Sequence, residues 1–168
     1  MTALLDVLRN DVDAAVQRAA VHSIWKCHLE GEEKTLATLM WAAEKHRDAN
    51  VRKAAVESLE KLTVKGDPLG VECLSRCLVD AHAEVRESAV RALERAAHEG
   101  SEEAVAAAES MMQDESWFVR RAAARSLTML EPEGERQTSV AAKVFGKEDK
   151  LWYGEVQGYL TKPLFYPI

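Results

Sequence analysis

A motif that recurs at a nearly fixed interval constrains this chain of 168 residues more than any other feature. Four valines follow one another at steps of 35, 34 and 34 residues, namely Val16, Val51, Val85 and Val119. Four glycines keep the same uneven steps, namely Gly31, Gly66, Gly100 and Gly134. Because a period of about 20 to 50 residues is typical of stacked repeats, we expect a solenoid in which each repeat contacts its neighbours.

Each copy of the motif predicts a helical hairpin. Val85, Ala89 and Leu93 lie four residues apart on one apolar helix face, and the other copies keep this spacing. Asp67 with Pro68, and Ser101, have the residue types that begin helices, and the glycines suit a left-handed residue at a helix end. We expect first helices over residues 2–9, 33–45, 68–79 and 102–113, and second helices that begin near Ala14, Asn50, Glu84 and Trp117.

An acidic residue stands six positions before an arginine in two of the copies. The pairs are Asp80 with Arg86 and Asp114 with Arg120. On these residues the pattern resembles HEAT repeats, of the short variety that also occurs in phycobilisome-lyase-like proteins. The resemblance implies an all-α fold, a right-handed alpha-alpha superhelix, with the Asp and Arg of successive copies joined in a ladder. Two positions depart from the pattern, since Gln17 replaces the arginine of the first copy and His46 the acid of the second.

The last quarter of the chain differs in composition. Residues 131–168 contain three of the four prolines, and a degenerate fifth copy can be traced because Asp149, Trp152 and Tyr153 match Asp114, Trp117 and Phe118 at a step of 35. We therefore predict four repeats over residues 1–136 and a fifth repeat with an extended tail over 137–168. Two roles stay open for the tail: it caps the stack, or it docks on a partner through Leu164, Phe165 and Tyr166.

Charge and cysteine content limit the possible partners and compartment. A net charge of -6 argues against a nucleic-acid binder, because affinity for a polyanion needs Lys and Arg. No apolar run approaches the roughly 20 residues of a membrane span, and no secretory signal is readable. Cys27, Cys73 and Cys77 cannot all pair within one chain, which favours an intracellular, reducing compartment.

The sequence offers no catalytic constellation. It contains no phosphate-binding glycine loop, nucleophile elbow or His-Glu-x-x-His element. Cys73 and Cys77 could offer two ligands to a metal, but they align with Ala107 and Met111 in the next copy, so we expect them in the core. The chain is therefore predicted to have no catalytic residue, metal, cofactor or small-molecule substrate.

The outward positions of the second helices are the candidate binding surface, on the presumed concave face. In the first copy they hold Arg18, His22, Trp25 and Lys26. The candidate partner-binding residues of the whole chain are Trp25, Trp41, Lys53, Glu57, Glu87, Arg91, Arg95, Arg121, Arg125, Trp152, Tyr153, Leu164, Phe165 and Tyr166. In the alternative interpretation, Trp25 and Trp41 cover an open end or a turn, and the charges form solvated pairs such as Lys53 with Glu57 and Glu87 with Arg91.

These features predict a non-catalytic protein-interaction scaffold, or a small subunit of a larger complex, whose partners are proteins. The alternative is a bilin lyase or chromophore-handling protein, because the repeat type that the chain resembles also occurs there. Incubation with a bilin and a phycobiliprotein apoprotein, followed by absorbance, separates the two.

Overall fold

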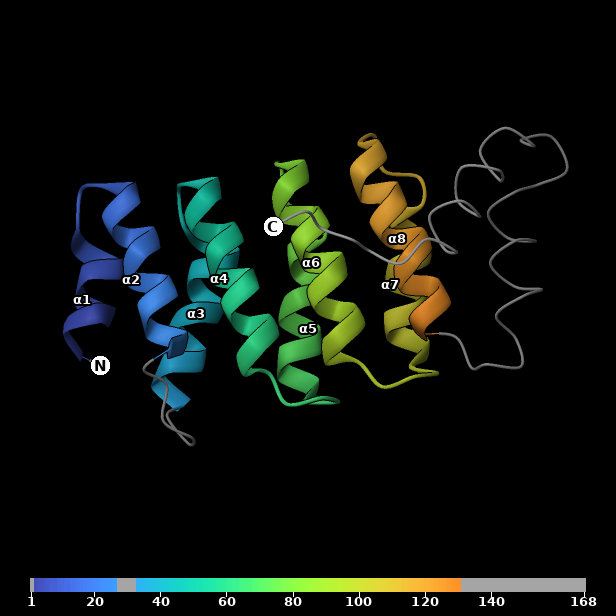
Figure 1. Ribbon diagram of the computed structural model, residues 1–168, viewed down its shortest axis with the longest axis horizontal. Coiled ribbons are helices and arrows are strands. Elements are labelled where there is room, and N and C mark those ends of the chain that lie inside the picture. Colours follow the sequence, from blue (N-terminus) through green and yellow to red (C-terminus); the bar gives the residue numbers. More distant parts are fainter. Residues whose placement is uncertain (1, 27–32, 131–168) are drawn as a thin grey trace, which may run out of the picture.

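Eight α-helices form four consecutive hairpins in the described part of the chain (Figure 1). The computed structural model describes residues 2–26 and 33–130. The helices are α1 (Thr2–Asn10), α2 (Ala14–Lys26), α3 (Glu33–Lys45), α4 (Ala49–Leu62), α5 (Pro68–Cys77), α6 (Ala83–Ala96), α7 (Glu102–Met111) and α8 (Trp117–Leu130). The expected hairpins are confirmed, and none of the described helices is long and apolar enough to cross a membrane.

Local sequence signals account for several of the helix ends. Asp67 and Ser101 cap α5 and α7 as expected, because their side chains accept hydrogen bonds from the backbone N–H groups of Gly70 and Ala104. Both helices end two residues earlier than expected. After α5 the N–H of Leu78 donates to the carbonyl of Ser75, three residues back, and after α7 the N–H of Met112 donates to the carbonyl of Glu109. These shorter-range bonds form a tighter last turn that closes each helix.

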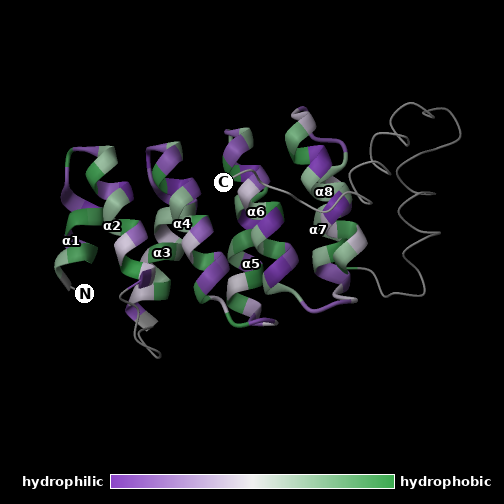
Figure 2. Cartoon of the chain, viewed as in Figure 1, coloured by the Kyte–Doolittle hydropathy of each residue, from purple (hydrophilic) through white to green (hydrophobic). Residues whose placement is uncertain are grey.

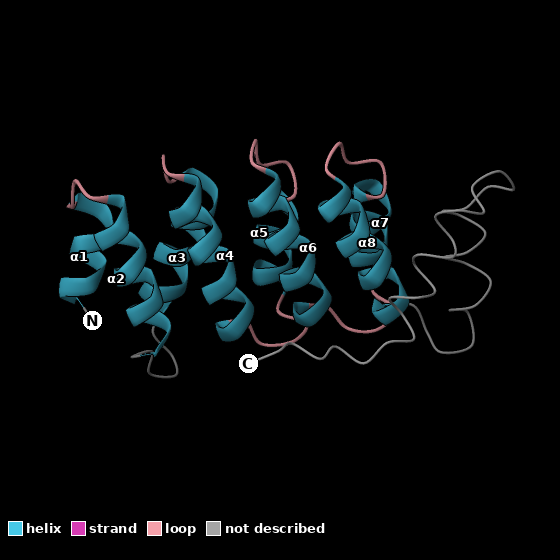
Figure 3. Ribbon diagram, turned by 45° about the horizontal axis from the view of Figure 1, so that its top comes forward, coloured by secondary structure: helices cyan, strands magenta, loops and turns pink. Residues whose placement is uncertain are grey.

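The helices lie in two rows. The first helices α1, α3, α5 and α7 form one row, and the second helices α2, α4, α6 and α8 form the other (Figures 1 and 3). Each second helix packs directly on the next one, whereas successive first helices touch only lightly. The second helices thus form the more closely packed of the two rows. We call the outward surface of α2, α4, α6 and α8 the second-helix face.

Small side chains make this close packing possible. Ala54, Ser58 and Ala92 are buried in the row, and large residues such as Leu59 and Leu93 fill the space between the two rows. The Ser58 hydroxyl donates to the carbonyl of Ala54, so a polar side chain is tolerated there. Alanine and serine columns in the sequence therefore correspond to contacts between neighbouring repeats.

Loops that contain Gly66 and Gly100 connect the second repeat to the third and the third to the fourth, at the opposite edge from the hairpin turns (Figure 3). Gly66 and Gly100 have φ values of 84° and 77°, the left-handed conformation that was expected. They do not end the helices themselves, because Thr63 and Ala97 close α4 and α6 in extended conformations. Instead the N–H groups of Gly66 and Gly100 donate to the carbonyls of Ala96 and Leu130, each over 2.6 Å. The glycine turns thus bind the last turn of the next second helix.

Part of the sequence analysis falls outside the described residues. The boundary at residue 136, the fifth repeat, the tail with Leu164, Phe165 and Tyr166, and Cys27 are all in this category. Those assignments stay predictions.

Gly66 provides a test of the glycine turns. A Cβ at this position would collide with the imidazole of His98, in addition to the strain of a positive φ. We expect Gly66→Ala to lower the free energy of unfolding, measured in urea, by more than about 1 kcal/mol. The loss should be smaller in a His98→Ala background, where only the strain remains. An equal loss in both backgrounds would contradict the collision.

Candidate functional site

Two arginines join successive repeats by bidentate ion pairs. Arg52 donates from Nε and Nη2 to Asp80 over 2.6 and 2.9 Å, and Arg86 contacts Asp114 in the same way over 2.7 and 2.9 Å. Each arginine also donates from Nη1 to a carbonyl in the hairpin turn of its own repeat, that of His46 or that of Asp80. The ladder implied by the resemblance is therefore present, and it runs from the Arg of one repeat to the Asp of the next.

The aspartates of the ladder are held from both sides. Asp80 and Asp114 each accept a backbone N–H two residues on, from His82 and Ser116, over 2.8 Å. The hydrogen bond from Arg86 holds the pKa of Asp114 below its ordinary value, although burial opposes this. Burial would raise the pKa of Asp80, but the bonds from Arg52 and His82 lower it further than burial raises it. Both side chains are nearly buried and fully occupied, so we assign them a structural role.

The two departures from the repeat pattern stand at the positions where an arginine–aspartate pair between the first two repeats would lie. Gln17 holds the arginine position of the first repeat, and His46 holds the aspartate position of the second. His46 Nδ1 accepts from the N–H of Asp48, as the aspartates accept two residues on, and Gln17 Nε2 donates to the carbonyl of Leu8. Burial lowers the pKa of His46 and favours its neutral form. The cation and the anion are thus replaced together, which leaves no unpaired buried charge.

The ladder predicts a pH-dependent contribution to stability. Because the pKa of Asp114 is lower in the folded chain, its pair with Arg86 stabilises fully above the unfolded value of about 3.9 and is lost as the pH falls. Arg86→Ala should lower the free energy of unfolding at pH 7 by about 2–4 kcal/mol, and should reduce the loss of stability between pH 5 and pH 3. Urea unfolding at several pH values measures both effects.

Arg76 is the matched control for this substitution. It also binds two carboxylates, those of Glu44 and Glu72, but its side chain is 49% exposed. Arg76→Ala should cost less than about 1 kcal/mol, because solvent screens exposed pairs. Equal costs at the two positions would argue against the special role of the ladder.

A second set of contacts joins neighbouring second helices to one another. Lys61 lies over the ring of Trp25 at 4.2 Å, Arg95 pairs with Glu60 at 3.0 Å, and the Ser126 hydroxyl donates to Glu94 at 3.0 Å. Trp25 stands where the later repeats have Glu60 and Glu94, so its ring replaces a carboxylate as the neighbour of a cation. Trp25 and Arg95, both candidate binding residues, therefore also link repeats.

The other aromatic candidate in the described part lies away from this surface. Trp41 is 41% exposed, but it belongs to α3 in the first row, and its ring meets the edge of His46 at 6.2 Å. The structure does not bring Trp41 together with the second-helix candidates, because α3 packs behind α4.

Three arginines of the second-helix face have no acidic partner within the described residues. Arg18, Arg91 and Arg125 are exposed, and no described carboxylate lies within 4.0 Å of their guanidinium groups. The expected pair of Lys53 with Glu57 is present at 4.0 Å, whereas Glu87, which is half-buried, is not paired with Arg91. These arginines can form new ion pairs without breaking old ones.

An aromatic cluster lies at the start of α8. The rings of Trp117 and Phe118 stack with centroids 3.9 Å apart, and the guanidinium of Arg121 lies 4.9 and 5.7 Å from their centroids. Both rings remain nearly half exposed. The candidate Arg121 is therefore arranged by two aromatic neighbours that the sequence analysis had not placed in the site.

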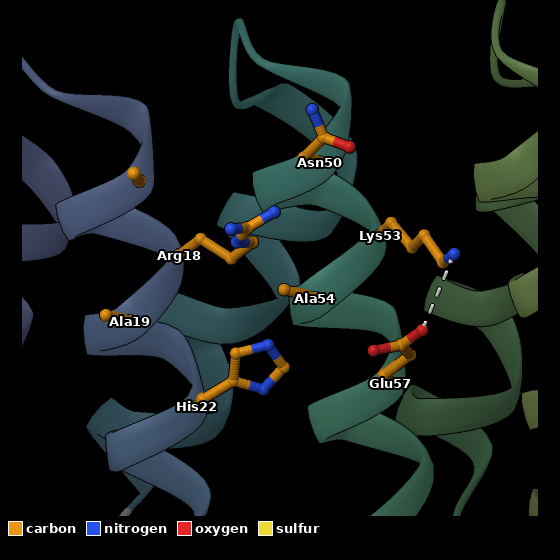
Figure 4. A pocket seen from close by; sticks show the side chains of 8 residues that line it. Arg18, Ala19, His22, Asn50, Lys53, Ala54 and Glu57 are labelled. Carbon is orange, nitrogen blue, oxygen red and sulfur yellow. Dashed lines mark ion pairs between the residues drawn. The ribbon is translucent and has the colours of Figure 1, made fainter.

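A pocket opens on the second-helix face between α2 and α4 (Figure 4). Its volume is about 420 Å³, and it is lined by Ala15, Arg18, Ala19, His22, Asn50, Lys53, Ala54 and Glu57. Arg18 and His22 project from α2 toward α4, while the paired Lys53 and Glu57 lie on the side of α4 that faces α6 (Figure 4). The sequence analysis noted Arg18 and His22 only as outward residues. The alanines Ala15, Ala19 and Ala54 in the sequence could have predicted the pocket, because their small side chains leave space beside Arg18 and His22.

The charge of the second helices differs in sign from that of the whole chain. Helices α2, α4, α6 and α8 contain eleven Lys and Arg residues and five Glu residues, a net charge of +6, whereas the chain carries -6. Figure 2 shows hydrophilic residues recurring along the second helices. Three of the eleven are the ladder positions Arg52, Arg86 and Arg120. The others lie outward, where a partner can meet them.

The described residues hold no cluster of His, Cys, Asp and Glu side chains suited to a metal ion. Cys73 and Cys77 are buried in the core, as expected from their alignment with apolar positions. A hydrogen bond with Cys77 and burial raise the pKa of the Cys73 thiol, so it stays protonated and is a poor ligand or nucleophile.

Stacked helical hairpins joined by repeated side-chain and glycine contacts define an α-solenoid protein. A family model described as HEAT repeats matches residues 1–94 and 77–151. These matches cover most of the sequence, and the chain belongs to the HEAT-repeat family. No curated protein matches it.

Proposed function

We propose that this protein is a non-catalytic interaction scaffold, or a small subunit of a larger assembly, that binds a protein partner through the second-helix face. HEAT repeats in general serve as protein-interaction scaffolds, and a solenoid presents one continuous inner surface to a partner. The proposal rests on a difference in burial and pairing among the arginines of the second helices. Arg52 and Arg86 are buried and fully bonded within the stack, whereas Arg18, Arg91 and Arg125 are exposed and unpaired among the described residues.

The exposed, unpaired arginines of the second-helix face are better suited to binding a partner than to stabilising the fold. Surface cations contribute little to folding, but they steer a partner of opposite charge and fix its orientation. The surface also alternates in sign, because Glu57 and Glu87 lie among the arginines. A mixed pattern of this kind favours a partner with a defined arrangement of charges.

Site-specific crosslinking tests the proposed face. A benzoylphenylalanine at position 91 or 125 should crosslink the same protein in a native extract, and the same probe at Leu69 or Glu103 of the first row should not. Arg91→Glu with Arg125→Glu should then weaken the purified complex at least about tenfold, with an unchanged melting temperature, because neither side chain is paired in the described fold. Capture only from positions 69 and 103 would place the binding surface on the other row.

We propose the C-terminal tail as a second contact with the partner. Its residues Leu164, Phe165 and Tyr166, with Trp152 and Tyr153 before them, provide apolar and aromatic side chains of the kind that anchor docking peptides. Deletion of residues 159–168 should leave the melting temperature unchanged and weaken the complex. A large fall in melting temperature would instead identify the tail as the cap of the stack.

A further inference from the structure

We propose that the second-helix face recognises an acidic protein segment, and that the pocket between α2 and α4 receives a Glu or Asp side chain which pairs with Arg18. This inference rests on the proposed function, since it uses the same face, and it adds the chemistry of the partner and the point where it is anchored.

Arg18 has the properties of an anchoring residue. Its side chain is exposed at the pocket and has no carboxylate partner within the described residues (Figure 4). A guanidinium group offers a planar set of N–H donors that matches a carboxylate in two parallel bonds. His22, one turn further along α2, adds a ring nitrogen on the same wall.

The shape of the pocket fits a side chain that enters between two helices. Ala15 and Ala19 on α2 and Ala54 on α4 leave the space open, and about 420 Å³ exceeds the volume of one acidic side chain several-fold. Glu57 also lines the pocket, but it is paired with Lys53 at 4.0 Å, so Arg18 has the unpaired charge of the lining.

The charge distribution favours an acidic protein over a nucleic acid. Without the three ladder arginines, the second helices carry eight Lys and Arg residues and five Glu residues, and this net charge of +3 attracts a negative partner to a chain that is otherwise acidic. The five glutamates Glu57, Glu60, Glu84, Glu87 and Glu94 lie on the same helices and would repel an evenly charged phosphate backbone. A peptide can place its acidic residues at the arginines and neutral residues at the glutamates.

The repeat spacing predicts the distance between the acidic residues of the segment. Packed helices lie about 8–10 Å apart, so Arg91 lies two steps, or about 20 Å, from Arg18, and Arg125 lies one step further. An extended peptide covers about 3.3 Å per residue. We therefore expect a second acidic residue about six positions from the one in the pocket, and a third about three positions beyond it.

Peptide selection on the full chain tests this inference. The probe is a display library of random 16-residue peptides, panned at about 150 mM NaCl so that weak long-range attraction is screened. Selected peptides are made with a fluorescein label, and the Kd is measured by fluorescence anisotropy. We expect acidic peptides with the spacing above, and a single Glu→Gln change at the anchoring residue should weaken binding several-fold.

Charge reversal at the pocket identifies the anchoring pair. Arg18→Glu should raise the Kd at least about tenfold, whereas Lys34→Glu, the same change of charge on α3 of the first row, should alter it less than about twofold. A peptide whose anchoring Glu is changed to Arg should regain affinity for the Arg18→Glu variant. This recovery excludes a folding defect as the cause, and melting temperatures of both variants provide a second check.

The other outcomes overturn the inference in distinguishable ways. Neutral peptides, or acidic peptides that bind the Arg18→Glu variant as well as the original chain, would contradict the pocket but leave the proposed function intact if positions 91 and 125 still crosslink a partner. A fluorescein-labelled 20-nucleotide single-stranded DNA that binds more tightly than any peptide, and loses affinity in Arg18→Glu, would identify a nucleic-acid surface instead. Absence of any peptide, together with crosslinks only from the first row, would overturn both proposals.

Discussion

The stack depends on the packing of each second helix against the next one, and between the later repeats an ion pair of an arginine with an aspartate adds to this contact. A single hairpin leaves one apolar face uncovered, so the repeats are stable only in contact. The pairs of Arg52 with Asp80 and Arg86 with Asp114 fix how far each repeat slides on its neighbour, because two parallel bonds tolerate little displacement. Between the first two repeats, Gln17 and His46 occupy these positions without charge. This junction therefore has no arginine–aspartate pair, and it also leaves no unpaired buried ion.

The same residue type serves two purposes in this protein, and burial separates them. Arg52 and Arg86 are nearly buried, and they bond to the hairpin turns of two successive repeats. Arg18, Arg91 and Arg125 lie on the outer side of the same helices, where they meet solvent. Because the ladder and these three arginines use different sides of each second helix, Arg18, Arg91 and Arg125 can vary without disturbing the stack. This separation makes the second-helix face the natural place for recognition.

Much of the candidate site was visible in the sequence, but its internal contacts were not. The repeat register identified the outward positions, including Lys53, Glu57, Arg91 and Arg125, since helical spacing fixes which residues point away from the core. It did not show that Lys61 covers Trp25, that Arg95 binds Glu60, or that Trp117, Phe118 and Arg121 form one cluster. Those contacts join residues of different repeats or depend on ring orientation, neither of which follows from spacing within one helix.

The sequence by itself determined the class of fold, the number of described hairpins and the starts of the helices to within one residue, because periodicity and capping residues act within a few positions along the chain. It also implied that the Asp and Arg of successive repeats would meet. Only the tertiary structure decided that Gln17 and His46 each bond to the backbone of their own repeat, that Gly66 and Gly100 donate to the next repeat, and that α2 and α4 leave a pocket beside Arg18. The last two features depend on how closely one repeat lies against another, and that distance is set by packing across the stack rather than by any local stretch of sequence.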